Sequence, residues 1–254
     1  MNRASRKVAI VTGGAGGIGR AAALAFAEQG VRVVIADIDD ERGEQTAREL
    51  VDGGASAAYV RADVAKASDV HELVESAVRL YGRLDYAMNN AGILGATGSA
   101  TADCDEENWD RVIAVNLTGV FLCMKFEIPR MLEFGGGAIV NTASSLSFKA
   151  DVGYPAYVAS KHGVVGLTRA AALEYSDQRI RINAVCPGIT KTGMIDEFIA
   201  DDPTIERALV AREPIGRLGL PEEVAAAAVW LCSEEASFIA GHALLVDGGQ
   251  VIQA

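Results

Sequence analysis

The chain has 254 residues, of which 50% are hydrophobic and 22% charged, so it carries enough apolar side chains for a folded core. Its 34 acidic and 23 basic residues give a net charge of -11, which argues against a nucleic-acid footprint and against docking on an anionic membrane. The longest uninterrupted apolar run, Val224 to Cys232, has nine residues, whereas a membrane span needs about 20.

Cysteine and histidine usage favours neither disulfides nor a metal centre. The four cysteines are far apart and include no C-x-x-C pair: Cys104, Cys123, Cys186 and Cys232. The three histidines show no metal-ligand spacing: His71, His162 and His242. The polar N-terminus precedes an apolar stretch, Val8 to Val11, that is too short for a signal-peptide core of about 7–15 residues. We therefore expect a cytoplasmic protein with reduced thiols and no metal ion.

Short β-branched runs alternate with longer stretches of helical spacing along the whole chain. In chain order, the predicted elements are a strand at Lys7–Thr12, a helix at Gly17–Gly30, a strand at Val31–Asp37, a helix at Asp39–Asp52, a strand at Ala57–Ala62, a helix at Ser68–Tyr81, a strand at Leu84–Asn89, a helix at Trp109–Phe134, a strand at Gly137–Thr142, a helix at Tyr157–Tyr175, a strand at Ile180–Cys186, a helix at Pro221–Cys232 and a strand at Ala243–Val246.

The predicted strands lack polar alternation, which indicates burial on both faces, and their alternation with helices makes neighbouring strands parallel. The expected fold is therefore α/β, a doubly wound parallel sheet of about seven strands with helices on both faces. Residues 1–254 are expected to form a single domain. The stretch Gly188–Arg217 is predicted to be a long irregular connection with two prolines and a weak helical pattern, and segments of this kind are commonly lids or binding loops.

A glycine-rich turn follows the first predicted strand and reads VAIVTGGAGGIGR over residues 8–20. Glycine lets the backbone approach a pyrophosphate, and the helix that follows offers unpaired N–H groups and a partial positive charge. The second strand ends in Asp37, where an acid can bind ribose hydroxyls and repel a 2′-phosphate. The sequence therefore predicts NAD rather than NADP. Two alternatives stay open: Asp37 only caps the next helix, or Arg20 and Arg42 admit the phosphate.

Tyr157 and Lys161 lie four residues apart on a predicted helix and therefore share one face. A nearby ammonium group favours the phenolate and lowers the pKa of a tyrosine from its usual value of about 10. Such a phenol can donate or accept a proton near neutral pH. Ser144 lies thirteen residues upstream of Tyr157, at the end of a predicted strand, where open parallel sheets bind ligands. Without Ser144, the alternative interpretation is that Tyr157 and Lys161 form only an ordinary contact on the helix surface.

These motifs resemble those of the short-chain dehydrogenase/reductase family, and the resemblance covers nearly the whole chain. The matching segments occur in this order: TGGAGGIG at 12–19, Asp63-Val64, NNAG at 89–92, Asn116 in VNLTG, Ser144, YVASK at 157–161, PGITKT at 187–192 and VDGG at 246–249. The resemblance implies a Rossmann fold and an oxidoreductase that transfers a hydride between NAD(H) and a secondary alcohol or ketone.

The resemblance also implies roles for individual residues. Tyr157 is the expected general acid–base residue, and Lys161 is expected to lower its pKa and to bind the nicotinamide ribose. Ser144 should hold and polarise the substrate oxygen. Asn116 should stabilise the site and support a water relay through Lys161. The expected cofactor-binding residues are Gly13, Gly16, Gly17, Ile18, Gly19, Asp37, Ile38, Asp63, Val64, Asn90, Ala91, Gly92, Tyr157, Lys161, Pro187, Gly188, Ile189 and Thr192.

A substrate-binding loop is expected at about residues 188–217, and its neighbours suggest an apolar pocket. The apolar residues expected there are Phe148, Val152, Met194, Ile195 and Phe198. Lys149 and Lys191 are basic residues that could reach into it. The expected partner is therefore a small uncharged alicyclic or aliphatic alcohol, with no nucleic acid and no membrane.

Two other functions stay open at this point. The first is a 3-oxoacyl-thioester (acyl carrier protein) reductase with the same site, which the acidic charge and Asp37 disfavour. The second is a catalytically silent nucleotide-binding scaffold, which the presence of Ser144, Tyr157 and Lys161 disfavours. The helix over Tyr157–Leu173 is small or apolar on every side, so one face is expected to meet a second subunit. We expect a homo-oligomer, specifically a tetramer.

Overall fold

Seven parallel strands form one sheet in the computed structural model, which describes residues 7–199 and 202–253. The strands are β1 (Val8–Thr12), β2 (Arg32–Asp37), β3 (Ala57–Arg61), β4 (Tyr86–Asn89), β5 (Gly137–Thr142), β6 (Ile180–Pro187) and β7 (Ala243–Val246). Their order across the sheet is β3-β2-β1-β4-β5-β6-β7. The predicted doubly wound α/β fold is confirmed, because the strand order reverses between β1 and β4, which pair side by side.

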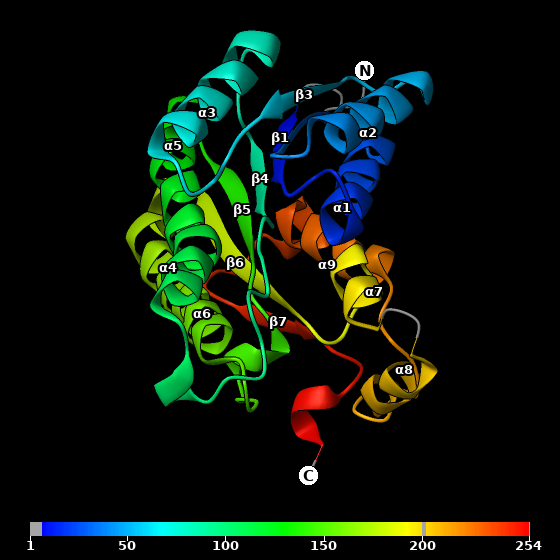
Figure 1. Cartoon of the computed structure of the whole chain (residues 1–254). Coiled ribbons are helices and arrows are strands. Elements are labelled where there is room, and N and C mark those ends of the chain that lie inside the picture. The colour runs from blue at the N-terminus through cyan, green and yellow to red at the C-terminus, as the bar shows by residue number, and fades with distance from the viewer. Residues whose placement is uncertain (1–6, 200–201, 254) are drawn as a thin grey trace.

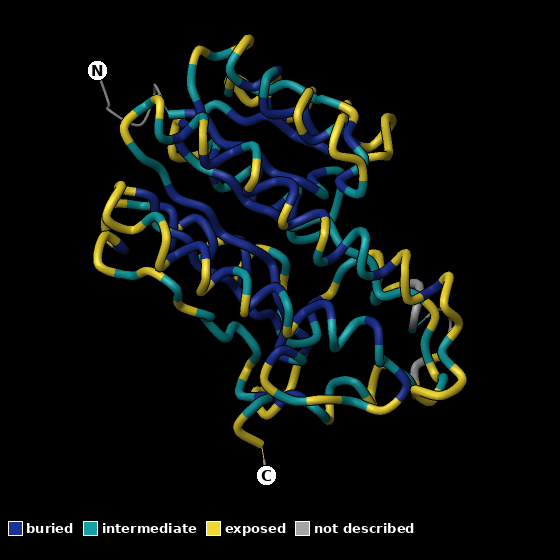
Figure 2. The backbone as a smooth tube through the Cα atoms, turned by 90° about the vertical axis from the view of Figure 1, so that its left-hand side faces the viewer, coloured by how far each residue is buried: buried dark blue, intermediate teal, exposed yellow. Residues whose placement is uncertain are grey.

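Helices cover both faces of this sheet (Figure 1). One face carries α1 (Gly17–Glu28), α2 (Asp40–Asp52) and α9 (Pro221–Cys232), and the other carries α3 (Ala67–Tyr81), α4 (Glu106–Ile113), α5 (Gly119–Glu133) and α6 (Pro155–Tyr175). Two separate apolar clusters fill the spaces between the sheet and each helical layer. The strands are accordingly buried while the outer helix surfaces are exposed (Figure 2), as expected for a parallel sheet covered on both sides.

Two segments differ from the predicted elements. The single helix predicted at Trp109–Phe134 begins earlier and is interrupted by a π-helical turn at Ala114–Thr118, which side-chain periodicity does not reveal. The stretch predicted to be irregular, Gly188–Arg217, contains two short helices, α7 (Gly193–Ile199) and α8 (Pro203–Val210). Proline occupies the first turn of α8, and Asp202 caps it by accepting a hydrogen bond from the Thr204 N–H, so local capping creates this helix.

The continuous helical stretch Glu106–Glu133 is long and apolar enough to cross a membrane by length and composition. Half of its most apolar window is buried inside the protein. Val120, Met124, Ile128 and Met131 from this stretch belong to the core cluster beneath the sheet. Packing of a core helix therefore accounts for its apolar character.

A chain of buried polar side chains crosses this core. The Glu127 carboxyl of α5 is only 1% exposed. Asn89 donates one hydrogen bond to its Oε2 (3.1 Å) and another to Asn141 Oδ1 (3.0 Å). Asn141 in turn donates to Thr168 Oγ1 on α6 (2.9 Å). Burial raises the pKa of Glu127 to about 8, because the carboxylate loses its hydration and gains only one hydrogen bond from Asn89.

The Glu127 carboxyl predicts a pH-dependent stability. Its folded pKa of about 8 lies above the ordinary value of 4.5, so the folded protein keeps a proton that the unfolded chain releases between these values. The free energy of unfolding should therefore fall as the pH rises from 5 to 8, by up to about 1.4 kcal/mol per pH unit. Glu127→Gln should remove this part of the slope in urea unfolding. Glu107→Gln, at an exposed position on α4, should keep it, and identical slopes for all three proteins would contradict the prediction.

Candidate active site

A cavity of about 500 Å³ lies along the carboxyl ends of the strands. Loops that follow β1, β2, β3, β4, β5 and β6 all contribute to its walls, so it crosses the point at which the strand order reverses. Most of the sequence-predicted site residues line it: Gly13, Gly16, Gly17, Ile18, Asp37, Ile38, Asp63, Val64, Asn90, Ala91, Gly92, Ser144, Tyr157, Lys161, Pro187, Gly188, Ile189 and Thr192. Gly19 and Asn116 are not among the lining residues.

The glycine-rich turn joins β1 to α1 at one end of this cavity. Gly13 adopts a φ of +64°, and a Cβ built there would lie 2.9 Å from the Ala91 Cα, so a side chain is excluded on two grounds. A Cβ on Gly19 would lie 2.0 Å from the Gly13 carbonyl oxygen. Gly19 therefore allows α1 to pack close to the turn. Gly16 caps α1 without a side-chain hydrogen bond, and nothing lies within 4 Å of where its Cβ would be.

Asp37 lies at the end of β2 and faces the same cavity. Its Oδ2 accepts a hydrogen bond from the Ala15 N–H in the glycine-rich turn (3.0 Å), and its Oδ1 accepts one from the Ile38 N–H (2.8 Å). Helix α2 is capped by Asp39, which accepts a hydrogen bond from the Arg42 N–H. Asp37 is therefore not the cap of the next helix, contrary to that alternative.

The two arginines that could admit a phosphate have different positions. Arg20 forms an ion pair with Glu49, with 2.6 Å between the charged atoms, and does not line the cavity. Arg42 does line it, and its nearest carboxylate oxygen, on Asp39, is 3.9 Å away. Of the two arginines, only Arg42 is therefore placed to bind the 2′-phosphate of NADP, which was the second alternative for this site.

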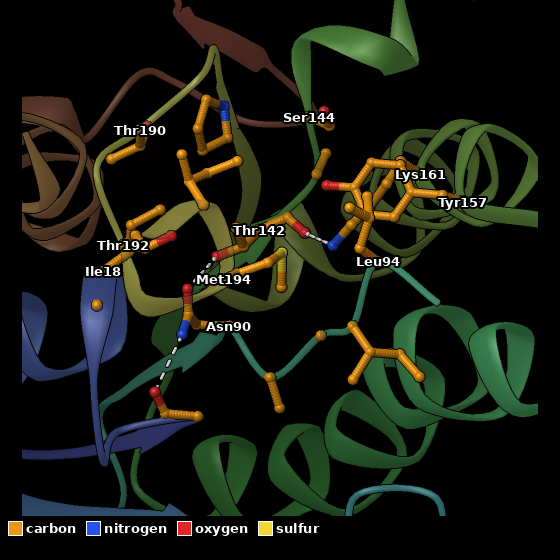
Figure 3. Close-up of a pocket in the computed structure, with 18 of the residues that line it drawn as sticks. Ile18, Asn90, Leu94, Thr142, Ser144, Tyr157, Lys161, Thr190, Thr192 and Met194 are labelled. Atoms are coloured by element: carbon orange, nitrogen blue, oxygen red, sulfur yellow. Dashed lines mark hydrogen bonds between the residues drawn. The ribbon is translucent and has the colours of Figure 1, made fainter. Parts of the chain in front are cut away.

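Tyr157 and Lys161 project from α6 into the other half of the cavity, across from Ile18 and Thr192 (Figure 3). Lys161 is only 3% exposed. Its Nζ donates a hydrogen bond to the Thr142 carbonyl at the end of β5 (2.8 Å) and lies 5.7 Å from the centre of the Tyr157 ring. This bond fixes the ammonium group between the end of β5 and the tyrosine.

Burial controls the acidity of both groups in this structure. Burial lowers the pKa of Lys161 to about 8. It raises the pKa of Tyr157, and a hydrogen bond with Ser144 offsets part of that rise. The net shift of the Tyr157 pKa is therefore upward, contrary to the lowering predicted from the ammonium group, and the only lowering influence on it is the hydrogen bond with Ser144. The Lys161 ammonium lies beside the ring and donates to a carbonyl.

Ser144 is distinguished from the neighbouring serines by its hydrogen bonds. Ser145 donates to Gln250 Oε1 (2.6 Å) and Ser147 donates to the Lys161 carbonyl (2.8 Å), so both hydroxyl protons are engaged within the protein. Ser144 Oγ accepts a hydrogen bond from the Leu146 N–H (3.1 Å). Ser144 lines the cavity and forms the hydrogen bond with Tyr157 noted above. The thirteen-residue spacing thus points to the serine that interacts with the phenol.

Asn116 lies behind the cavity in the π-helical turn and is fully buried. Its side chain accepts a hydrogen bond from the Ile93 N–H and donates one to the Ile93 carbonyl, both at 2.8 Å. A Cβ on Gly92 would meet Asn116 Oδ1 at 3.3 Å and Lys161 Nζ at 3.4 Å. Asn116 therefore holds the loop after β4 in a position where a side chain at residue 92 would crowd Lys161.

Several large apolar side chains line the cavity: Leu94, Leu146, Met194, Ile195 and Leu209. Met194 and Ile195 were expected there. Four other residues predicted to reach this pocket do not line it: Phe148, Val152, Lys149 and Lys191. The side chain of Phe198 lies outside the described part of the chain. Arg212 lies within the substrate-binding loop predicted at about residues 188–217, although it was not singled out there. Sequence reasoning did not predict Tyr154 and Gln250, whose contact with the cavity depends on distant segments coming together.

Comparisons with known proteins agree with this geometry. Residues 13–250 match the sequence family described as enoyl-(acyl carrier protein) reductase. Cyclohexanol dehydrogenase of Acinetobacter sp. (strain SE19) is 48% identical over 247 residues, which cover 97% of this chain and 96% of that protein.

Two solved structures are similar over nearly their whole length. The crystal structure of levodione reductase has a TM-score of 0.93 and 34% identity, and the match covers 98% of this chain and 99% of that one. The crystal structure of 3-ketoacyl-(acyl-carrier-protein) reductase from Brucella melitensis, complexed with NADH, has a TM-score of 0.89 and 36% identity, over 96% and 98% of the two chains. The chain therefore belongs to the short-chain dehydrogenase/reductase family, oxidoreductases that interconvert alcohols and carbonyl compounds with a nucleotide cofactor.

Proposed function

We propose that this protein uses NAD(H) to interconvert a small secondary alcohol and its ketone, with Tyr157 as the acid–base residue. The observation that carries the proposal is a single cavity that holds the Tyr157, Ser144 and Lys161 side chains at one end and the glycine-rich turn with Asp37 at the other. A nucleotide and a small alcohol can therefore lie in one continuous space. We further infer that the whole chain acts as one domain, with residues 188–217 as its substrate-binding loop.

The residues around the glycine-rich turn fit a dinucleotide. The exclusion of a Cβ at Gly13 and the open space at Gly16 leave the backbone N–H groups at the start of α1 accessible to a pyrophosphate. Asp37 would hold the adenosine ribose, and Asp63 would contact the adenine. Ile189 and Thr192 would meet the nicotinamide carboxamide at the other end. When bound, the nicotinamide supplies or accepts the hydride.

The proton is handled by the side chains of α6 and β5. In alcohol oxidation, the Tyr157 phenolate would take the hydroxyl proton, and in ketone reduction the phenol would return it to the carbonyl oxygen. Ser144 would donate a hydrogen bond to the same substrate oxygen. The positive charge of Lys161 favours the phenolate, and the ammonium group would also bind the nicotinamide ribose. Asn116, through the loop at Ile93, would keep Lys161 in place and support a water relay.

The apolar cavity walls favour an uncharged alicyclic or aliphatic substrate. Leu94, Leu146, Met194, Ile195 and Leu209 offer a ring no charged partner, and cyclohexanol dehydrogenase is among the similar proteins. A second candidate is reduction of a 3-oxoacyl thioester, which the similarity to the Brucella melitensis reductase favours. The net charge of -11 disfavours it, because an acyl carrier protein that is itself acidic would be repelled. We expect the protein to act in the cytoplasm.

Tyr157→Phe tests the acid–base role. The variant should lose turnover, with less than a tenth of the wild-type kcat remaining, because phenylalanine cannot exchange the proton. The variant should still bind NADH, as followed by fluorescence titration. Tyr175→Phe makes the same chemical change at the far end of α6 and should keep wild-type kcat. A Tyr157→Phe protein that retains more than a tenth of the rate would refute the role.

Asp37→Asn tests the choice of cofactor. The wild-type protein should have a lower KM for NAD than for NADP, because the carboxylate repels a 2′-phosphate. Removing the charge should lower the NAD-to-NADP ratio of kcat/KM by about tenfold, equivalent to 1.4 kcal/mol. Glu44→Gln, an exposed acid on α2, makes the same change in net charge and should leave the ratio unaltered. A wild-type KM for NADP below that for NAD would overturn the assignment.

The proposed homo-oligomer, a tetramer, follows from apolar side chains left exposed on α4, α5 and α6. These are Trp109, Phe121 and Leu173, of which Leu173 is 87% exposed. Because these helices cover one face of the sheet (Figure 1), a second copy of the chain could bury them together. Light scattering at micromolar concentration should give about four times the monomer mass of 26.6 kDa, and Phe121→Asp should reduce it. A wild-type monomer mass would contradict the proposal.

A further inference from the structure

An ion pair between Asp151 and Arg212 forms part of the cavity lining. Asp151 is in the loop that leads into α6, and Arg212 follows α8, so the pair joins two segments that are 61 residues apart in sequence. Arg212 donates a hydrogen bond from its guanidinium group to Asp151 Oδ2. Both residues line the same cavity as Tyr157. The two charged groups therefore face this cavity rather than a remote surface.

Asp151 and Arg212 are the main charged groups that a bound substrate would meet. The side chains are partly buried, at 27% exposed for Asp151 and 41% for Arg212. Asp151 Oδ1 also accepts a hydrogen bond from the Val152 N–H (2.9 Å), which holds the carboxylate in place. Lys161, the charged residue of the described lining beside Tyr157, is engaged with the Thr142 carbonyl and serves the reacting oxygen. The remaining walls are mainly apolar.

We propose that the Asp151–Arg212 pair sets the charge specificity of the enzyme, admitting neutral alcohols and excluding those that carry a carboxylate. This inference rests on the proposed function and specifies its substrate class. A substrate carboxylate near Arg212 would have to displace Asp151, whose like charge would then lie close to it. A neutral ring meets no such penalty, because the pair is already satisfied and the adjacent walls are apolar.

Two probe substrates of the same shape test the wild-type protein. They are cis-4-hydroxycyclohexanecarboxylate and its primary amide, which differ by one charge at the carbon opposite the reacting alcohol. At pH 8, we expect kcat/KM for the amide to exceed that for the carboxylate by at least about tenfold, which corresponds to 1.4 kcal/mol of transition-state stabilisation. Similar values for the two probes would overturn the proposal. No oxidation of any secondary alcohol would instead contradict the proposed function.

Three variants then assign the discrimination to the pair. Asp151→Asn leaves Arg212 unpaired, so the carboxylate-to-amide ratio of kcat/KM should rise by about tenfold or more. Arg212→Gln leaves Asp151 unpaired, so the ratio should fall below that of the wild type. The double variant, Asp151→Asn with Arg212→Gln, carries no charge at these two positions. Its carboxylate-to-amide ratio of kcat/KM should lie between the ratios of the two single variants.

This order separates a charge effect from a structural one. Loss of the contact between the loop and α8 alone would change the ratio in the same direction in both single variants, and that result would overturn the proposal. Glu72→Gln removes one charge from an exposed ion pair with Arg79 on α3. It should leave the ratio within twofold of the wild type. A shift equal to that of Asp151→Asn would attribute the effect to net charge and refute the assignment.

Discussion

The hydrogen bond from Lys161 to the Thr142 carbonyl connects the sheet to the helix that carries the proposed acid–base residue. It joins the last residue of β5 to the second turn of α6. An ammonium group that is 3% exposed needs such a partner, because burial without one would cost several kcal/mol. Once the lysine is fixed, Tyr157 is held one helical turn away. The position of the phenol therefore depends on the end of a strand as well as on its own helix.

The parallel sheet brings the two halves of the proposed reaction to one edge. All strands run in the same direction, so every loop after a strand opens on the same side. The loop after β1 supplies the glycine-rich turn, and the loop after β5 supplies Ser144. Asn90 bridges them, since its side chain donates to the Gly13 carbonyl (3.3 Å) and accepts from Thr142 Oγ1 (3.3 Å) (Figure 3). The spacing between the nucleotide end and the proton-transfer end is thus set by neighbouring strands.

The features that the sequence predicted are those encoded by local patterns. The strand runs, the glycine-rich turn and the pair at Tyr157 and Lys161 each have a spacing that a single segment reveals. The π-helical turn was missed because it adds one residue to a turn without changing the apolar composition. Arg212 lies within the predicted loop at 188–217, but its pairing with Asp151 was not predicted, because Asp151 is distant in sequence. The upward shift of the Tyr157 pKa was not predicted either, because it arises from burial, which only the folded structure shows.

The two ends of the cavity differ in how they are built, and this bears on function. The glycine-rich turn and Ser144 directly follow strands of the sheet and are held by backbone pairing. Leu209 and Arg212 belong to α8 and the turn after it, outside the sheet, and Met194 belongs to the short helix α7 (Figure 1). Substitutions in α7 and α8 can therefore change the walls of the cavity with little effect on the strands of the sheet. In such an arrangement the sheet holds the reacting groups, and peripheral segments determine which substrate binds. Proteins of one fold can therefore act on many different alcohols.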